Sequence, residues 1–76
     1  MNELELSARV IALESALNAM LLTRDRPTEA YQKFNEIWTA SVRTLNQTSP
    51  DNAALTQAIQ VECNKLGASF RAYSTV

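Results

Sequence analysis

Apolar residues recur at spacings of three and four along most of this chain, which is the period expected of helices with a buried face. The pattern breaks twice, around residues 24–28 and 49–51, where proline and short polar residues gather. We therefore predict three helices, over residues of about 3–23, 28–47 and 50–72, in a single all-α domain that spans residues 1–76.

Residues typical of helix starts mark each predicted boundary. Asn2 and Glu5 have the spacing of a capping box at the first helix. Either Asp25 or Thr28 is the expected cap of the second helix, and the sequence leaves that choice open. The segment 49–51, Ser-Pro-Asp, predicts a third helix that begins with a serine cap and a proline in its first turn.

The first helix has two apolar sides. The first stripe contains its larger residues, namely Leu6, Val10, Leu13, Leu17, Met20 and Leu21. The second stripe is Leu4, Ala8, Ile11, Ser15, Ala19 and Leu22. A helix of a lone bundle needs one such stripe. We predict that the first stripe fills the core and that the second is left as an interface, most simply that of a homodimer.

The other two helices each supply a wide apolar face. In the second helix it comprises Tyr31, Phe34, Trp38, Ser41, Val42 and Leu45, and in the third Leu55, Ile59, Cys63, Leu66, Phe70 and Tyr73. Short connections favour an up-down-up three-helix bundle. The alternative is a hairpin of the last two helices, with the first helix extended toward a second subunit. If the interface reaches the second helix, Trp38 is its expected anchor.

Residues suited to catalysis or metal binding are scarce. The chain has no histidine, one cysteine and one glycine, so it offers no neutral-pH imidazole base, no zinc ligand set and no glycine-rich phosphate loop. Cys63 falls on an apolar stripe and is expected to be a buried structural thiol. We predict a protein that is not an enzyme and has no cofactor.

The distribution of charge disfavours two classes of partner, nucleic acid and the membrane interior. A net charge of −1 disfavours nucleic acid, because domains that bind duplexes usually carry a strong basic excess. Glu14 and Asn18 interrupt the apolar run 10–22, which is too short and too polar to span a membrane and lacks the features of a signal peptide. We expect a cytoplasmic location.

One end of the predicted bundle collects basic and aromatic side chains. The candidate anion-binding residues there are Arg24, Arg26, Lys33, Arg71, Tyr31 and Tyr73. A small phosphorylated or nucleotide ligand is one interpretation, since the start of a helix also favours anions. The other is that Arg24 and Arg71 complement helix C-termini, while Asp25 and Glu29 neutralise the remaining charge.

The sequence thus favours association over chemistry. We expect a non-enzymatic helical protein-binding module that acts as a homo-oligomer and contacts another protein. In size and helical layout it is similar to small bacterial or phage adaptors, chaperones and inhibitors. The alternative function is sequestration of a small anionic ligand at the basic end.

Overall fold

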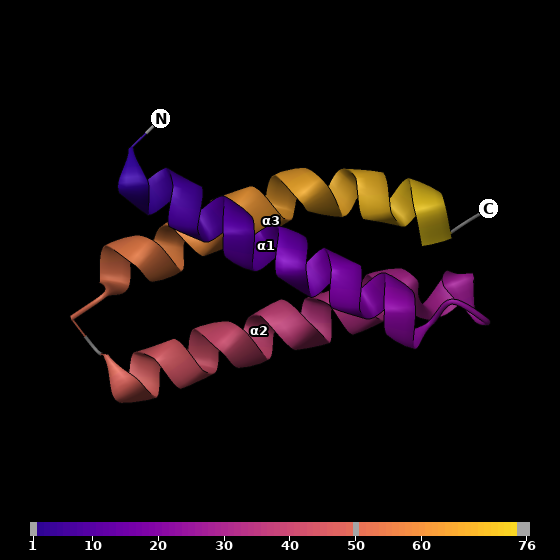
Figure 1. Cartoon of the computed structure of the whole chain (residues 1–76), viewed down its shortest axis with the longest axis horizontal. Coiled ribbons are helices and arrows are strands. Elements are labelled where there is room, and N and C mark those ends of the chain that lie inside the picture. Colours follow the sequence, from indigo (N-terminus) through magenta and orange to yellow (C-terminus); the bar gives the residue numbers. More distant parts are fainter. Residues whose placement is uncertain (1, 50, 75–76) are drawn as a thin grey trace.

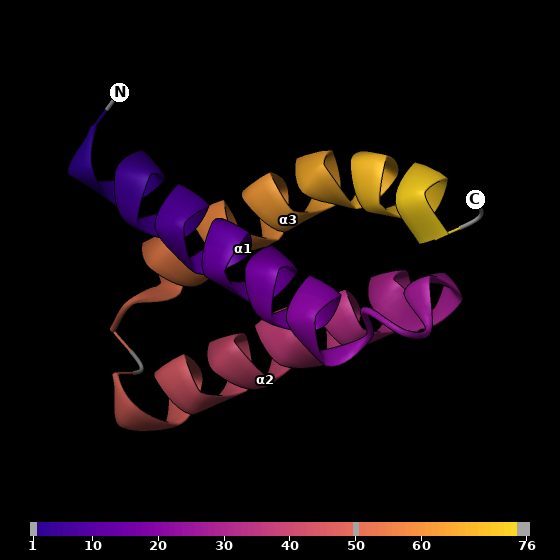
Figure 2. The same cartoon turned by 45° about the vertical axis from the view of Figure 1, so that its right-hand side comes forward.

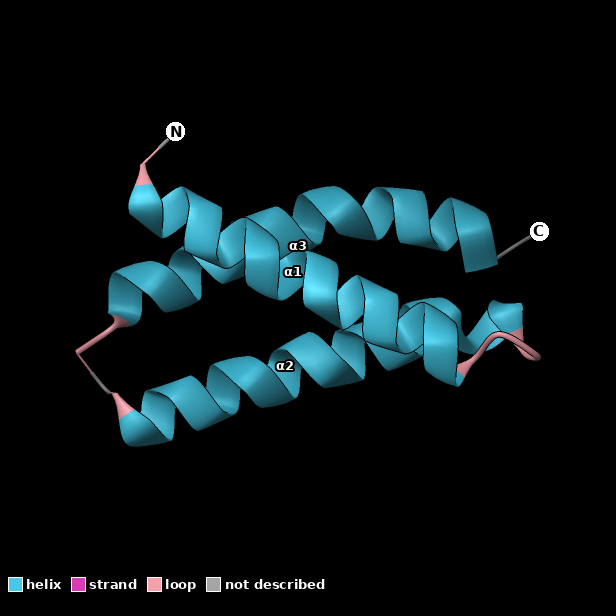
Figure 3. Cartoon of the chain, viewed as in Figure 1, coloured by secondary structure: helices cyan, strands magenta, loops and turns pink. Residues whose placement is uncertain are grey.

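Three α-helices make up nearly all of the chain (Figure 3). The computed structural model describes residues 2–49 and 51–74, the last two for their backbone alone. Helix α1 spans Glu3–Leu22, α2 spans Ala30–Thr48 and α3 spans Ala53–Ser74. A 3₁₀ turn, η1 (Pro27–Glu29), precedes α2. The predicted all-helical fold is confirmed.

The helix boundaries agree with the sequence at the first helix and differ at the others. The Asn2 side chain accepts a hydrogen bond of 2.7 Å from the amide of Glu5, so the predicted cap of α1 is present. Neither Asp25 nor Thr28 caps the second helix, because Arg26 and Glu29 occupy the positions before η1 and α2 without a side-chain cap. These two predictions are therefore wrong.

The predicted start of the third helix is also wrong. Ser49 ends α2 with an amide that donates to the carbonyl of Leu45, and α3 begins at Ala53. The Asn52 amide donates to the carbonyl of Ser49, and this hydrogen bond lies outside both helices. Pro50 lies outside the described residues. The prediction assigned this connection to the helix because serine and proline are common both in turns and at helix starts.

Helix α1 lies across the other two helices. Its first half runs beside α3 and its second half leads toward the start of α2, as Figures 1 and 2 show from two directions. The connection after α1 and the end of α3 share one end of the molecule (Figure 1). All three helices contact one another, so the alternative in which the first helix extends away from a hairpin is wrong.

The core combines small residues of α1 with large residues of α2 and α3. Phe34 of α2 and Phe70 of α3 stack with ring centroids 4.7 Å apart and planes 8° from parallel. Ile59 and Cys63 are fully buried beside them. From α1, the core takes Ala8, Ala12, Ser15, Ala16 and Ala19. Small side chains let α1 approach the layer below it closely, as the near-crystalline packing of protein interiors requires.

The orientation of α1 is the opposite of the predicted one. All six residues of the first stripe, expected in the core, are exposed. Ala8, Ser15 and Ala19 of the second stripe, expected at an external interface, are buried inside the bundle. The physical reason is space, because the aromatic pair and the aliphatic residues of α2 and α3 already fill the volume that larger α1 side chains would need.

Faces of the other helices follow the sequence closely. Ala30, Phe34 and Val42 of α2 are buried. The polar residues on its opposite side are exposed, namely Gln32, Glu36, Thr39, Arg43, Asn46 and Gln47. Gly67 lies inside α3, where the ring of Tyr31 approaches it. None of the described helices combines the length and the hydropathy needed to cross a membrane.

Candidate functional site: an apolar face on α1

The outer face of α1 is the most unusual surface of the described chain. The first stripe has exposed fractions from 40% at Met20 to 59% at Leu13, Leu17 and Leu21. Leu4 and Leu22 extend the exposed set at its two ends. In the described residues, Val61 of α3 is the one other large hydrophobic residue as open to solvent. Contiguous exposed apolar surface of this kind marks interaction sites on small proteins.

Sequence and geometry explain why this face forms. Helix α1 carries an apolar stripe on each of two sides, and an apolar stripe is normally covered by another element. The bundle covers the side of Ala8, Ala12 and Ala19. The side of Leu13 and Leu17 has no helix of the same chain over it.

A groove runs beside the stripe, between α1 and α3. It encloses about 280 Å³, and its walls are Arg9, Ala12, Leu13, Glu62, Lys65, Leu66 and Ser69. Leu13 belongs both to the stripe and to the groove, so the two features form one continuous surface. The apolar floor and charged rim are typical of protein contact sites.

The groove's rim contains the ion pair that ties α1 to α3. Arg9 Nε lies 2.7 Å from Glu62 Oε1, and Lys65 Nζ lies 3.6 Å from Glu62 Oε2. The hydrogen bond from Arg9, followed by the two nearby positive charges, holds the pKa of Glu62 below its ordinary value. This pair could not be predicted from the sequence, because residues 53 positions apart give no local signal.

Some of the predicted interface residues are buried in the bundle and others are exposed to solvent. Ala8, Ser15 and Ala19 are buried, and the Ser15 hydroxyl donates to the carbonyl of Ile11. Ile11 itself is half-buried against the core. Leu4 and Leu22 are exposed and remain available to a partner.

Trp38 lies in a different environment from the α1 stripe. It packs half-buried against the core, and its Nε1 donates to Asn35 Oδ1 at 2.9 Å, one turn earlier in α2. Since its polar atom is satisfied within its own helix, Trp38 is accounted for as a core residue.

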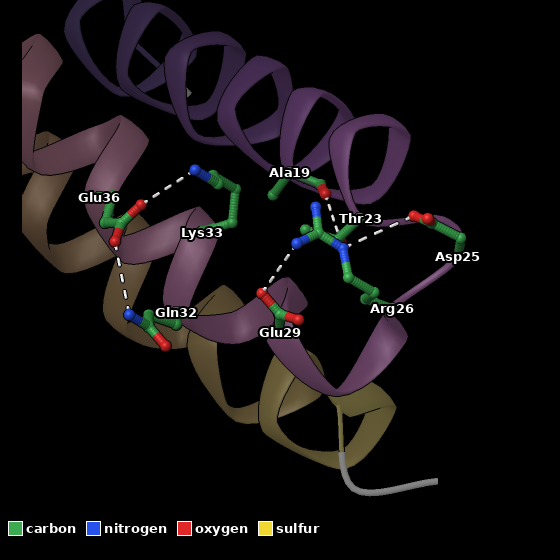
Figure 4. Close-up of polar contacts among 8 residues, drawn as sticks. All are labelled: Ala19, Thr23, Asp25, Arg26, Glu29, Gln32, Lys33 and Glu36. Carbon is green, nitrogen blue, oxygen red and sulfur yellow. Dashed lines mark hydrogen bonds and ion pairs between the residues drawn. The ribbon is translucent and has the colours of Figure 1, made fainter.

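Two residues at the basic end of the bundle, Arg26 and Lys33, have acidic partners. Figure 4 shows Arg26 between Asp25, at 3.7 Å, and Glu29, at 3.3 Å. Lys33 pairs with Glu36 at 3.2 Å in the same view. These contacts correspond to the second interpretation of the sequence, in which acidic neighbours neutralise this end.

Two of the candidate anion residues do lie together. Tyr31 and Arg71 line a small hollow of about 170 Å³ between α2 and α3, with Gly67 and Asn35 in its wall. Arg24 is exposed in the turn after α1 and has no ion pair with any described residue. The side chain of Tyr73 lies outside the described part of the chain. The structure therefore brings together only part of the predicted set.

Reactive chemistry has little support in the described residues. Cys63 is buried at the helix interface, and burial, together with the negative charge of Glu62, raises the pKa of its thiol to about 11. A thiol with that pKa is almost entirely protonated near neutral pH and is a poor nucleophile. No cluster of three metal-binding side chains occurs among the described residues.

Comparison with known proteins adds no family or relative. A match to this chain was found neither among protein-family models, nor among curated proteins, nor among solved structures.

Proposed function

We propose that this chain is a non-enzymatic helical module that binds protein through the outer face of α1. In this proposal an up-down-up bundle associates with itself through α1 and presents helical surface to a further protein partner in the cytoplasm. The observation that carries it is the exposure of the first stripe along the whole length of α1.

The free energy of burying apolar side chains favours a partner on the outer face of α1. Fully burying a leucine, valine or methionine side chain contributes about 1.5–3 kcal/mol relative to leaving it in water. The six stripe residues retain 40–59% of their surface, so a large part of that free energy is available to an association step. A chain of 76 residues has a small core of its own, and oligomerisation is a common source of added stability at this size.

Charge favours a protein over a membrane surface as the partner. The charged residues of α1 are Glu3, Glu5, Arg9 and Glu14, and Arg9 is paired with Glu62. Helices that lie in a membrane interface usually combine an apolar face with many lysine and arginine residues. The acidic balance of α1 is the reverse of that pattern.

A charge placed on the stripe tests the proposal. The variant Leu17→Glu should shift sedimentation toward the monomer and abolish partner capture, because the carboxylate would lose its hydration in any contact. Gln57→Glu adds the same charge at an exposed position of α3 and is the matched control. A wild-type chain that is monomeric at every concentration and whose partner binding survives Leu17→Glu would exclude the proposal.

The choice of position follows from the structure. Ile11 is half-buried against the core, so Ile11→Glu would disturb the bundle as well as any partner. Leu17 is exposed, so a charge there leaves the core packing intact.

A small anionic ligand at the basic end is the second candidate function. The observation in its favour is the shared hollow of Tyr31 and Arg71. A thermal-shift screen with phosphate and nucleotides tests it, since a ligand at one hundred times its dissociation constant adds about 2.7 kcal/mol of stability. Absence of any shift would remove this candidate.

A further inference from the structure

We infer that the occupant of the α1 face is a second copy of this chain, with its own α1 running antiparallel to the first. This inference rests on the proposed function and adds to it the seam along which the two copies of α1 pair and the direction of that pairing. Three features carry it, namely the spacing of the stripe, the area that it exposes and the distribution of charge along α1.

The stripe has the spacing of a helix-pairing seam. Leu6, Val10, Leu13, Leu17 and Met20 alternate in steps of four and three, which is an average period of 3.5 residues. That period keeps apolar side chains on one line between two helices that pack along their length. Helix α1 has 20 residues, or roughly 30 Å at 1.5 Å per residue, so the seam runs along most of a helix.

The exposed area matches what a specific dimer needs. The six stripe residues, each about half exposed, contribute on the order of 600 Å² of accessible surface, against about 800 Å² per partner in a typical specific interface. Leu22 at one end and the groove wall at Leu66 lie next to this surface and add to it. A two-fold pairing of one stripe with its own copy therefore gives an interface of ordinary size.

Charge selects the antiparallel direction. Glu3 and Glu5 lie in the first turn of α1, and Arg24 lies just beyond its last residue. A parallel pair would bring the acidic starts together and the two arginines together. An antiparallel pair places each acidic start near the arginine of the other copy and also opposes the two helix dipoles favourably.

The Arg9–Glu62 pair keeps the seam accessible. Arg9 is a charged neighbour of the stripe, and Glu62 of α3 holds its guanidinium on the groove side. The carboxylate of Glu62 is therefore satisfied within the same chain. A second α1 meets apolar side chains along the seam without having to desolvate an unpaired arginine.

Cysteine crosslinking tests the direction. Three single variants, Glu3→Cys, Glu14→Cys and Arg24→Cys, replace exposed residues near the start, the middle and the end of α1. Each is treated with a short bis-maleimide. The wild-type chain is the control for Cys63, which is buried.

The antiparallel arrangement predicts one specific set of products. Glu14→Cys forms a crosslinked dimer on its own, because the middle of the helix meets its own copy. Glu3→Cys and Arg24→Cys each give no dimer alone but give one when the two variants are mixed. Adding Leu17→Glu to any of them should abolish the product.

Other outcomes distinguish a failure of the antiparallel direction from a failure of self-association. A crosslinked dimer of Glu3→Cys alone would show parallel pairing and overturn this inference while leaving self-association through α1 intact. A sedimenting dimer with no crosslink from any variant or mixture would show that another face is used and would also overturn it. A monomer at all concentrations would overturn self-association itself.

Discussion

The guanidinium Nε of Arg9 lies 2.7 Å from Oε1 of Glu62, which joins the outer side of α1 to α3. The other ion pairs of the described residues connect positions no more than three apart in the sequence. Among the ion pairs of the described residues, this is therefore the one that joins two α-helices. It also closes one wall of the groove beside the apolar stripe.

Acid should weaken the bundle through Glu62. Arg9 above all, and Lys65 as well, lower the pKa of Glu62 below 4.5 in the folded chain. The resulting stabilisation is fully present above the unfolded pKa and is lost as the pH falls through the folded pKa. We expect Glu62→Gln to lower the urea midpoint at pH 7, and the difference from wild type to shrink as the pH falls below 4.5.

Asp51→Asn is the control for this measurement. Asp51 is exposed in the turn before α3 and forms no ion pair with any described residue. Its substitution should leave the midpoint at pH 7 close to the wild-type value. An equal loss in both variants would show that general charge, and not the contact of Arg9 with Glu62, is responsible.

Small side chains on the inner face of α1 should be intolerant of enlargement. Ala8 is fully buried in the core. Ala8→Leu should destabilise the monomer by about 1–3 kcal/mol, the usual effect of overpacking. Leu17→Ala should change monomer stability by no more than about 0.5 kcal/mol, because its side chain is mostly in water.

Chemical denaturation at low protein concentration measures both variants. The concentration must be low enough that the wild-type chain is monomeric, so that association does not contribute. If Leu17→Ala proved the more harmful of the two, the assignment of inner and outer faces would be reversed.

Local sequence signals predicted the positions of the helices. They did not predict which side of α1 is buried. The period of apolar residues located all three helices, and the faces of α2 and α3 were correctly assigned. Periodicity also found both stripes of α1. Hydrophobicity then assigned the larger residues to the core, although the space there is set by Phe34 and Phe70 from the other helices.

The candidate site shows the same limit. A leftover apolar surface on the first helix was predicted, but its residues were mostly wrong, because Leu4 and Leu22 alone of the second stripe are exposed. The Arg9–Glu62 contact depends on how α1 crosses α3, which is a property of packing between distant segments. The spacing of neighbouring residues shows neither which stripe faces outward nor which residues of α1 and α3 meet.

Replacing Gly67 with alanine should stabilise the bundle. Glycine inside a helix is less favourable than alanine by about 1 kcal/mol. Gly67 does not have a positive φ, and an added Cβ would lie 3.6 Å from Cε1 of Tyr31, an ordinary contact distance. We expect Gly67→Ala to raise the melting temperature by several degrees.

A larger residue at the same position gives the contrasting result. Gly67→Leu carries further atoms toward the Tyr31 ring and should lower the melting temperature. If Gly67→Ala were itself destabilising, the room beside Tyr31 would be smaller than the 3.6 Å separation indicates.

Cys63 should be unreactive in the folded chain. Its thiol has a pKa of about 11, raised from 9.0 chiefly by burial. A folded pKa above the unfolded one gives stability that is present below pH 9 and is lost as the pH rises toward 11. We expect slow labelling by Ellman's reagent at pH 8, rapid labelling in urea, and a falling urea midpoint above pH 9.

The alanine face of α1 has a consequence for how this chain can change. Ala8, Ala12 and Ala19 hold the helix in the bundle, whereas the leucines behind them contribute little to the packing of the single chain. If α1 binds a partner as proposed, folding and recognition depend on different positions of one helix. Substitutions at the outer positions would then change the choice of partner while the bundle stays intact, and α1 could be used to select new binding specificities.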